Sequence, residues 1–298
     1  MQAVIYSRYG GPEVLELAEV GEPEPGAGQV RVRVQAAGVN AYDAKRRSGR
    51  FARGTQPASP LVPGLEAAGI VDRVGIGVVG TGIGDEVFGL ATGGAAAELA
   101  VLTAWAPQPA GFSAVQSGGL AVVAETAVRA LDLLGVGPGD RLLVHGGSGG
   151  VGQAAVQLAR LRGAMVAATA SPANHPLLAR YGALPTTYGD GMADRVRELL
   201  GEPTLVLDIA GSQLDELLTL VPAPDRVVTI ANYAAGERGV RVTSDVGDAP
   251  AALAQVAALA AAGRFALQVS ETFGFDRAAA AHRLVETRRA AGKIVLVP

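Results

Sequence analysis

The stretch VHGGSGGVGQAAVQLAR, residues 144–160, decides the fold of this chain. Its glycines fit the pattern G-x-G-x-x-G, and they lie between an apolar run and an Ala-rich, helix-like segment. In such a turn the first glycine permits a tight bend, the second lets the backbone approach a pyrophosphate, and the third lets the helix pack on the strand. A merely flexible strand-to-helix turn is the alternative. The pattern favours a dinucleotide-binding loop made of Gly147, Ser148, Gly149, Gly150, Val151 and Gly152.

Strand-like and helix-like segments alternate on both sides of this loop, beginning after a helical pattern at 113–134. Repeated βα units of this length predict a doubly wound parallel sheet, which is covered by helices on both faces. The expected strands are 141–145, 164–169, 183–186, 204–209 and 226–231, and the expected helices are 150–162, 174–181, 192–200 and 213–220.

The beginning of the chain has a different character. The run VRVRV at 30–34 alternates strictly, and short strand-like runs with Gly and Pro turns follow it, which favours a β-rich, partly open barrel. The last residues end in another strand, KIVLV at 293–297. We therefore expect an inserted α/β domain at 119–262 and a β-rich domain made of 1–118 plus 263–298.

The end of the second strand bears on the choice of dinucleotide. An NAD site usually carries Asp or Glu there, about 20 residues beyond the glycines, to bind the ribose hydroxyls. Here the strand ends in Thr-Ala-Ser171 without an acid. A carboxylate would repel a 2′-phosphate, so its absence favours NADP over NAD. No cation follows at once, because Asn174 and His175 occupy the next loop.

Composition excludes several function classes. The 298 residues are 49% hydrophobic and carry a formal net charge of −3 without a basic block, so a nucleic-acid partner has no electrostatic basis. The chain has no cysteine, which removes disulfides and thiolate zinc sites. Neither a signal-peptide pattern nor an apolar run of about 18 residues is present, so we expect a cytoplasmic protein without a membrane segment.

The chain resembles the medium-chain dehydrogenase/reductases, specifically the zinc-free quinone oxidoreductase (zeta-crystallin-like) branch. Besides the glycine loop, the likeness lies in MQAV (1–4), GGPEVL (10–15), AAGVN (36–40) with Asp43, PGLEAAG (63–69), GDEVFG (84–89) and GKIVL (292–296). It covers essentially the whole chain. The resemblance implies a chaperonin-10-like (GroES-like) barrel domain split around a Rossmann domain, and homodimers joined through Rossmann sheet edges.

The resemblance also implies roles for particular residues. Asn40 and Thr126 fall near the nicotinamide end of the cofactor, and Ile230 falls in a loop that shapes the cleft. The 2′-phosphate contacts fall on Ser171, Asn174, Tyr188 and Arg288, with Arg289 as an alternative to Arg288. Because relatives usually carry a lysine where this chain has Asn174, weaker phosphate affinity is expected. The alternatives are a capping Asn, a core Thr, a packed Tyr and solvated arginines.

No metal site is expected. Where zinc-dependent relatives have Gly-His-Glu this chain has Gly64-Leu65-Glu66, so the imidazole ligand is missing. One carboxylate cannot supply the three ligands of a catalytic zinc site. Glu66 is therefore interpreted as a structural hydrogen-bonding residue, and the three histidines, at 145, 175 and 282, are too widely spaced to suggest a shared site.

Reduction of a quinone or an enone needs no Lewis acid, because hydride adds to an electron-poor centre and the product anion takes a proton from water. We therefore predict an NADPH-dependent quinone oxidoreductase acting on a small, planar, apolar carbonyl or quinone. The alternatives are an enoyl or enone reductase of the same superfamily and a non-catalytic, crystallin-like NADPH-binding protein. The enoyl reading is weakened because Phe51 stands where those relatives have a tyrosine.

The candidate catalytic residues are Asn40, Tyr42 and Asp43. Tyr42 offers a phenol as proton donor, with core packing or a solvent-facing ring as the alternative. Asp43 is interpreted as the hydrogen-bonding partner that holds the Asn40 loop.

Overall fold

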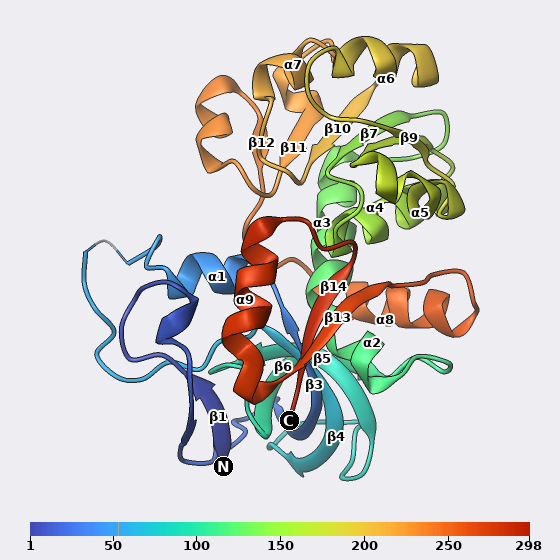
Figure 1. Ribbon diagram of the computed structural model, residues 1–298. Coiled ribbons are helices and arrows are strands. Elements are labelled where there is room, and N and C mark those ends of the chain that lie inside the picture. Colours follow the sequence, from blue (N-terminus) through green and yellow to red (C-terminus); the bar gives the residue numbers. More distant parts are fainter. Residues whose placement is uncertain (53) are drawn as a thin grey trace. The chain divides into compact units, whose positions relative to one another are not determined.

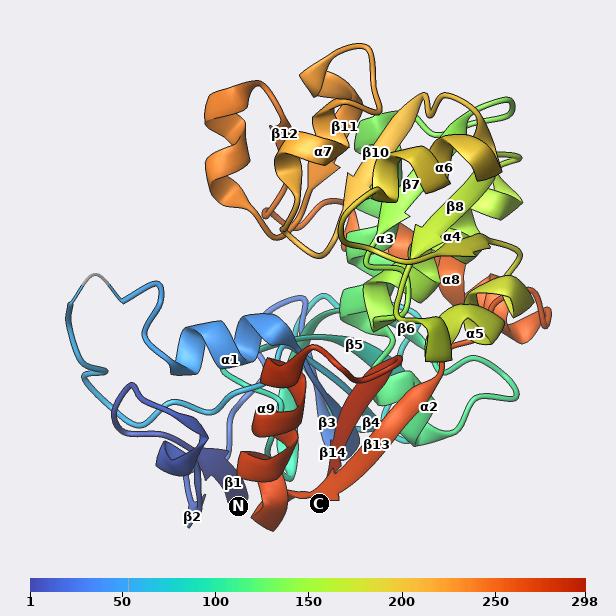
Figure 2. The ribbon, with the colours of Figure 1, turned by 45° about the horizontal axis from the view of Figure 1, so that its top comes forward.

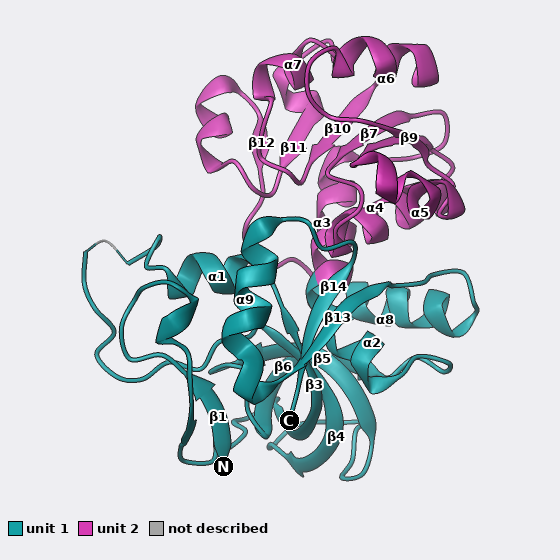
Figure 3. Ribbon diagram, in the orientation of Figure 1, with its two compact units in different colours: residues 1–122, 249–298 teal, residues 123–248 magenta. Residues whose placement is uncertain are grey.

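The computed structural model describes residues 1–52 and 54–298, which form two compact units (Figure 3). Unit 1 comprises Met1–Val122 and Ala249–Pro298, and unit 2 comprises Val123–Asp248. The expected domain boundaries at 118/119 and 262/263 differ from this division. The main reason is helix α8 (Ala249–Ala261), which packs on strand β6 (Leu99–Pro107) and so belongs to unit 1.

Unit 1 is built around a sheet that closes on itself. The sheet runs in the order β13 (Val269–Gly274), β14 (Lys293–Val297), β3 (Val30–Val39), β4 (Glu66–Val74), β5 (Glu86–Thr92) and β6. Strand β3 pairs with both β4 and β6, which closes four strands into a small barrel with β14 and β13 as an extension. Alternate side chains such as Val32, Val71 and Leu102 fill its interior.

Shorter elements surround this barrel. Strands β1 (Gln2–Ile5) and β2 (Glu16–Glu19) form a separate antiparallel hairpin, with a 3₁₀ turn, η1 (Pro12–Val14), between them. Helix α1 (Ala41–Arg47) follows β3 directly, and α2 (Ala114–Gly118) packs on β3 and β4. Helix α9 (Ala278–Thr287), preceded by η5 (Phe275–Arg277), packs against β13 and β14 (Figures 1 and 2).

The alternating run on β3 has one unexpected feature. Arg31 and Arg33 share a face, as the period of two predicts, but Arg31 is 3% exposed while Arg33 is exposed. Two hydrogen bonds of 3.0 and 2.9 Å join the Arg31 guanidinium to Asp72 on the neighbouring strand β4. The ion pair therefore keeps this charged side chain buried, because its partner supplies the hydrogen bonds that water would otherwise make.

Unit 2 is a doubly wound Rossmann sheet. Its six strands are all parallel, in the order β12 (Arg241–Val242), β11 (Val227–Thr229), β10 (Leu205–Asp208), β7 (Arg141–His145), β8 (Met165–Thr169) and β9 (Leu184–Thr186). The chain continues from β7 to β8 and β9 on one side of the sheet and then returns to β10, on the other side of β7. Strands β7 and β10 therefore flank the switch point at which such sheets bind ligands.

Helices connect these strands and cover the sheet. Helix α3 (Ala121–Leu134) leads into the unit, and α4 (Gly150–Leu161) packs on β7 and β8. Residues of α6 (Met192–Leu200) and α7 (Leu214–Leu218) share one apolar cluster with Leu143, Ala167 and Val206 of the sheet. The remaining elements are α5 (His175–Arg180) and the 3₁₀ turns η2 (Pro172–Asn174), η3 (Pro224–Arg226) and η4 (Tyr233–Arg238).

The expected helix at 113–134 is two helices, α2 and α3, and the prediction of one continuous pattern was wrong. A Cβ at Gly118 would lie 2.6 Å from the Ala36 Cβ, and one at Gly119 would lie 3.0 Å from the Lys293 Cε. These glycines let the chain pass close to the barrel, and the helix is interrupted there. The expected helix at 174–181 is α5, which agrees with the prediction to within one residue at each end, and the 3₁₀ turn η2 with Pro172 precedes it.

None of the helices in the described part of the chain has the length and apolar character needed to cross a membrane.

Candidate active site

The glycine loop of unit 2 leaves the carboxyl end of β7 and is held against β8. Gly146 has a φ of +98°, which favours glycine, and its N–H donates to the Thr169 Oγ1 at 3.0 Å. The N–H of Gly147 donates to the Thr169 carbonyl oxygen at 2.8 Å. Both hydrogen bonds tie the start of the loop to the last residue of the neighbouring strand.

The three glycines of the pattern have different surroundings. A Cβ at Gly147 would lie 2.8 Å from the Ala168 Cβ, and one at Gly152 would lie 2.3 Å from the Gly146 carbonyl oxygen. At Gly149, by contrast, a Cβ would meet nothing within 4 Å. Two glycines therefore serve close packing, whereas the middle one leaves open space beside the backbone.

Helix α4 begins at that open space. Its N-cap, Gly149, supplies no side-chain cap, so the first N–H groups of the helix are not bonded by a capping side chain. Free N–H groups and the helix dipole favour an anion at such a helix start. The geometry fits a cofactor pyrophosphate, which the loop 147–152 would hold through its backbone.

A buried histidine organises the same edge of the sheet. His145 ends β7, and its Nδ1 lies 2.9 Å from the Thr169 Oγ1, while its Nε2 lies 3.2 Å from the Ser212 Oγ. Burial lowers the pKa of His145, so its ring is neutral at pH 7. His145 thus links β7, β8 and the segment after β10. Ser212 takes part in this link, and no local pattern in the sequence indicates that role.

The predicted 2′-phosphate residues of unit 2 gather at the ends of two adjacent strands. Strands β8 and β9 pair in parallel, with Thr169 opposite Thr186, so the residues that follow them lie at one carboxyl edge. The Asn174 Nδ2 donates to the Ser171 Oγ at 3.2 Å, and Tyr188 is 58% exposed. This edge offers hydroxyl and amide groups and no carboxylate at the end of β8.

Arg195 supports that edge and was not singled out from the sequence. Its guanidinium donates to the carbonyl oxygens of Thr187, Gly189 and Asp190 at 3.2, 3.3 and 2.8 Å. These bonds hold the segment that carries Tyr188. The arginine lies on helix α6, several residues beyond the segment, and sequence spacing alone does not reveal such a contact.

Two other predicted residues lie elsewhere in unit 2. Thr126 is nearly buried on α3, and its hydroxyl lies 3.4 Å from the Glu125 Oε2. Ile230 follows β11, and its N–H donates to the Asp208 carbonyl oxygen at 3.1 Å. Ile230 therefore lies at the carboxyl end of the sheet, beside the switch point.

Unit 1 brings Asn40 together with two buried charged residues. The Lys293 Nζ donates to the Asn40 Oδ1 and to the Glu66 Oε1, both at 2.6 Å, and the Asn40 Nδ2 donates to the same Glu66 oxygen at 3.0 Å. The other oxygen, Oε2, accepts the Val122 N–H at 2.8 Å. We call Asn40, Glu66 and Lys293 the amide cluster. Its geometry confirms that Glu66 is a hydrogen-bonding residue.

Asp43 holds the backbone next to this cluster. Its Oδ2 accepts the Asn40 N–H at 2.8 Å, in a capping box at the start of α1, so the expected hydrogen bond to the Asn40 loop is present. Burial raises the pKa of Asp43 to about 6, although the Asn40 N–H and the charge of Lys293 oppose this shift. Asp43 therefore acts on the backbone of Asn40, and its carboxyl lies 3% exposed.

The other two predicted residues of unit 1 lie at its surface. Tyr42 is 43% exposed and stacks on Phe51, with 5.3 Å between the ring centroids. This is the solvent-facing alternative considered for Tyr42. Arg288 caps the C-terminus of α9 in the left-handed conformation, with a φ of +55°.

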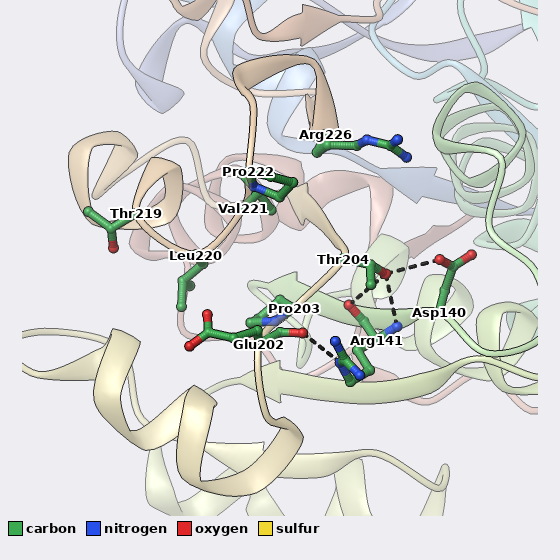
Figure 4. A pocket seen from close by; sticks show the side chains of 10 residues that line it. All are labelled: Asp140, Arg141, Glu202, Pro203, Thr204, Thr219, Leu220, Val221, Pro222 and Arg226. Atoms are coloured by element: carbon green, nitrogen blue, oxygen red, sulfur yellow. Dashed lines mark hydrogen bonds between the residues drawn. The ribbon is translucent and has the colours of Figure 1, made fainter.

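A separate hollow lies at the amino ends of the unit 2 strands, opposite the carboxyl ends from which the glycine loop leaves. It has a volume of about 590 Å³ and is bounded by residues that precede β7, β10 and β11, among them Asp140, Thr204 and Arg226. Figure 4 shows Thr204 bonded to Asp140 and Arg141, with 3.0 Å between the Thr204 Oγ1 and the Asp140 Oδ1. Because these are the amino ends of parallel strands, the hollow is remote from the glycine loop. Its polar groups bond to one another, which is a structural arrangement.

Within residues 1–52 and 54–298, no group of three or more His, Asp or Glu side chains is arranged to hold a metal ion.

Comparison with known proteins assigns the two parts of the chain to families. The model described as "Zinc-binding dehydrogenase" matches residues 115–296, and the model "Alcohol dehydrogenase GroES-like domain" matches residues 26–129. A quinone oxidoreductase of Rattus norvegicus is 36% identical over 229 residues, which span 70% of this chain and 69% of that protein.

Two further relatives match over the full chain. An Arabidopsis thaliana protein named "NADPH-dependent alkenal/one oxidoreductase, chloroplastic" is 33% identical over 316 residues, which span 100% of this chain and 80% of that protein. A mycobacterial protein solved in complex with NADPH is 27% identical and has a TM-score of 0.85, with 100% of both chains covered.

A doubly wound sheet with a glycine loop of the pattern G-x-G-x-x-G, inserted in the sequence of a GroES-like barrel, is typical of a dinucleotide-dependent oxidoreductase. The chain belongs to the medium-chain dehydrogenase/reductase family, in the branch that contains the quinone oxidoreductases. The family expected from the sequence motifs is thereby confirmed.

Proposed function

We propose that this protein is an NADPH-dependent reductase of quinones or similar α,β-unsaturated carbonyl compounds. The observation that carries the proposal is the loop at 147–152, with open space at Gly149 and a second strand that ends without a carboxylate. The relatives named for quinone and alkenal/one reduction, and the one solved with NADPH, support the same assignment.

When bound, NADPH would supply the hydride, and the protein would bind and orient the substrate and exclude water. The loop 147–152 would hold the pyrophosphate through backbone N–H groups, and Thr126 and Ile230 are the residues that we propose for the nicotinamide end. Asn40 offers an amide hydrogen bond at the reacting centre, with Asp43 fixing its backbone. Tyr42 is a candidate proton donor, and water is the other source. Zinc has no role, because the chain has no cysteine and has Leu65 where zinc-dependent relatives have a histidine ligand.

The test of the reaction is NADPH consumption by the purified protein with simple quinones and enones, with and without a chelator. We expect turnover that the chelator does not change. Tight NADPH binding without turnover of any quinone or enone would instead identify a non-catalytic NADPH-binding protein.

Cofactor choice depends on Ser171, Asn174, Tyr188 and Arg288, which we propose as the 2′-phosphate contacts. None of the three in unit 2 carries a positive charge, so Asn174→Lys is expected to tighten NADPH binding by about 10-fold through one charge-assisted hydrogen bond, and to leave NADH binding unchanged. Fluorescence titration with both cofactors measures the difference. Equal tightening of NADPH and NADH would contradict the assignment.

We further propose a homodimer joined through an edge of the unit 2 sheet and a cytoplasmic location. The edge strands of that sheet are β12 and β9, and a second sheet would add at the outer side of one of them. Analytical ultracentrifugation tests the dimer, and cell fractionation tests the location.

A further inference from the structure

The orientation of the Asn40 amide is determined by its two partners. An ammonium group only donates hydrogen bonds and a carboxylate only accepts them. The amide oxygen must therefore face Lys293, at 2.6 Å, and the amide nitrogen must face Glu66, at 3.0 Å. This uses one of the two hydrogens on the Asn40 nitrogen and leaves the second for another acceptor.

We propose that Lys293 is a positioning residue that makes Asn40 a directed hydrogen-bond donor toward a carbonyl oxygen. This inference rests on the proposed function, and the carbonyl belongs to the substrate or to the nicotinamide carboxamide. The Lys293 charge at the amide oxygen opposes the effect of the Glu66 carboxylate on the amide nitrogen, and the two partners together fix the direction of the remaining N–H. A donor held in a fixed direction favours a carbonyl that gains negative charge when hydride arrives.

The burial of the cluster supports this role. Lys293 is 4% exposed and Glu66 is 0% exposed, so neither charge is screened by water. Burying both charges carries a large desolvation cost, which hydrophobic residues of similar size would avoid. A charged pair retained at this position, bonded to a predicted site residue, points to a task beyond packing.

The backbone also makes room for the cluster. A Cβ at Gly38 would lie 2.3 Å from the Glu66 Oε1, and one at Gly119 would lie 3.0 Å from the Lys293 Cε. Strand β3, which ends just before Asn40, and the turn between α2 and α3 thus each approach one of the two charged side chains closely. A rotated Asn40 amide would place its nitrogen against the ammonium group, so this enclosure admits one orientation.

The chain offers a matched control in Arg31. Like Lys293 it is a buried cation of unit 1, at 3% exposure, and it is paired with a carboxylate, Asp72, at 2.9 Å. Its side chain forms hydrogen bonds with Asp72 and with the segment 22–24, and none of these residues is a predicted site residue. Arg31→Met therefore reports what the loss of a buried cation does to this unit without touching Asn40.

The experiment compares the full-length Lys293→Met and Arg31→Met variants with wild type. It measures NADPH affinity by fluorescence titration, and kcat and KM with a quinone. We expect Lys293→Met to lower kcat or NADPH affinity on the order of 10- to 100-fold, which is somewhat less than the effect of removing a direct hydrogen-bond donor. A loss in kcat assigns the substrate carbonyl as the acceptor, and a loss in NADPH affinity assigns the carboxamide. Arg31→Met is expected to lower thermal stability only.

Further variants separate orientation from folding. Lys293→Arg keeps the charge and is expected to recover part of the loss. Because Lys293→Met leaves Glu66 buried and unpaired, it is also made with Glu66→Gln, which removes both charges. In an Asn40→Ala background, Lys293→Met is expected to cause no further loss, since the lysine acts through Asn40.

Two results would overturn the inference. The first is that Lys293→Met causes the same loss in the Asn40→Ala background as in wild type. The second is that Lys293→Met and Arg31→Met have the same effects. If wild type turns over no quinone or enone, the proposed function fails by itself. NADPH affinity then decides about Lys293, because a loss specific to Lys293→Met upholds the inference and an unchanged affinity overturns it.

Discussion

The glycine loop of unit 2 and the amide cluster of unit 1 are polar sites built in opposite ways. The loop uses backbone groups and small residues, and its hydrogen bonds come mainly from N–H groups held by Thr169. The amide cluster uses long side chains whose charges are removed from water. The loop therefore tolerates no added atom at its packed glycines, whereas the cluster tolerates no lost charge. Mutations can test each half of this contrast.

The largest effect on stability is expected from Glu66→Leu. The substitution leaves Lys293 buried without its carboxylate, and an unpaired buried charge costs about 3–5 kcal/mol. Glu24→Gln is the control, since Glu24 likewise pairs with a cation, Arg73, but is 61% exposed, where an ion pair contributes about 0–1 kcal/mol. Urea denaturation at neutral pH measures both. If Glu66→Leu lowers the free energy of unfolding by less than Glu24→Gln does, the charge of the amide cluster is not the stabilising feature.

Gly152→Ala tests the packed part of the loop. The new Cβ would lie 2.3 Å from the Gly146 carbonyl oxygen, and overpacking of this kind costs about 1–3 kcal/mol. Gly137→Ala is the matched control, because its Cβ would meet nothing within 4 Å. Thermal unfolding of the two variants gives the comparison, and equal stability would show that the loop adjusts.

A smaller effect on the free energy of unfolding is expected from a change in pH, because the pKa of Asp43, beside the amide cluster, is shifted in the folded protein. The folded-state pKa of Asp43, about 6, lies above the ordinary value of 3.8, so the folded protein binds more protons between these values and gains stability as pH falls. Burial lowers the pKa of His282 to about 4, so the folded protein binds fewer protons between 6.5 and 4 and loses stability as pH falls. The two contributions oppose each other in wild type.

Asp43→Asn removes the stabilising contribution and keeps an oxygen that accepts the Asn40 N–H. We expect the variant to lose stability more steeply than wild type between pH 6 and pH 4, by up to about 1.4 kcal/mol per pH unit. Urea titrations at several pH values measure the slope. Parallel curves for variant and wild type would contradict the raised pKa of Asp43.

The smallest effect on stability is expected from Gly149→Ala, within about 0.5 kcal/mol, because the new methyl group meets open space. NADPH affinity is expected to fall by about 10-fold all the same, since the methyl group occupies the approach of the pyrophosphate. Calorimetric titration with NADPH measures the loss. Unchanged binding would place the pyrophosphate elsewhere.

The loop was predictable from the sequence because its geometry is local. The turn, its glycines and the start of the helix all lie within residues 144–160, and a contiguous pattern specifies them. Strand β14 was predictable for the same reason, from five consecutive residues. The amide cluster was predictable only in part. Asn40 and Glu66 were singled out, but Lys293 is 253 positions from one and 227 from the other, and only folding brings them together.

Other differences also trace to contacts between distant segments. The burial of Arg31 depends on Asp72, which a single strand pattern cannot show. The interruption between α2 and α3 depends on Ala36 and Lys293, which approach Gly118 and Gly119 from the barrel. Arg195 holds the Tyr188 segment through backbone carbonyl groups, which carry no sequence signature.

The scarcity of lysine has a practical consequence. The chain has two lysines, of which Lys293 is 4% exposed, while burial and the charges of Arg50 and Arg288 lower the pKa of Lys45. An amine-reactive acylating reagent will therefore modify Lys45 and the terminal amine first, and will reach Lys293 only when unit 1 opens. Acylation at Lys293, read by peptide mass spectrometry, is thus a built-in reporter of the opening of unit 1.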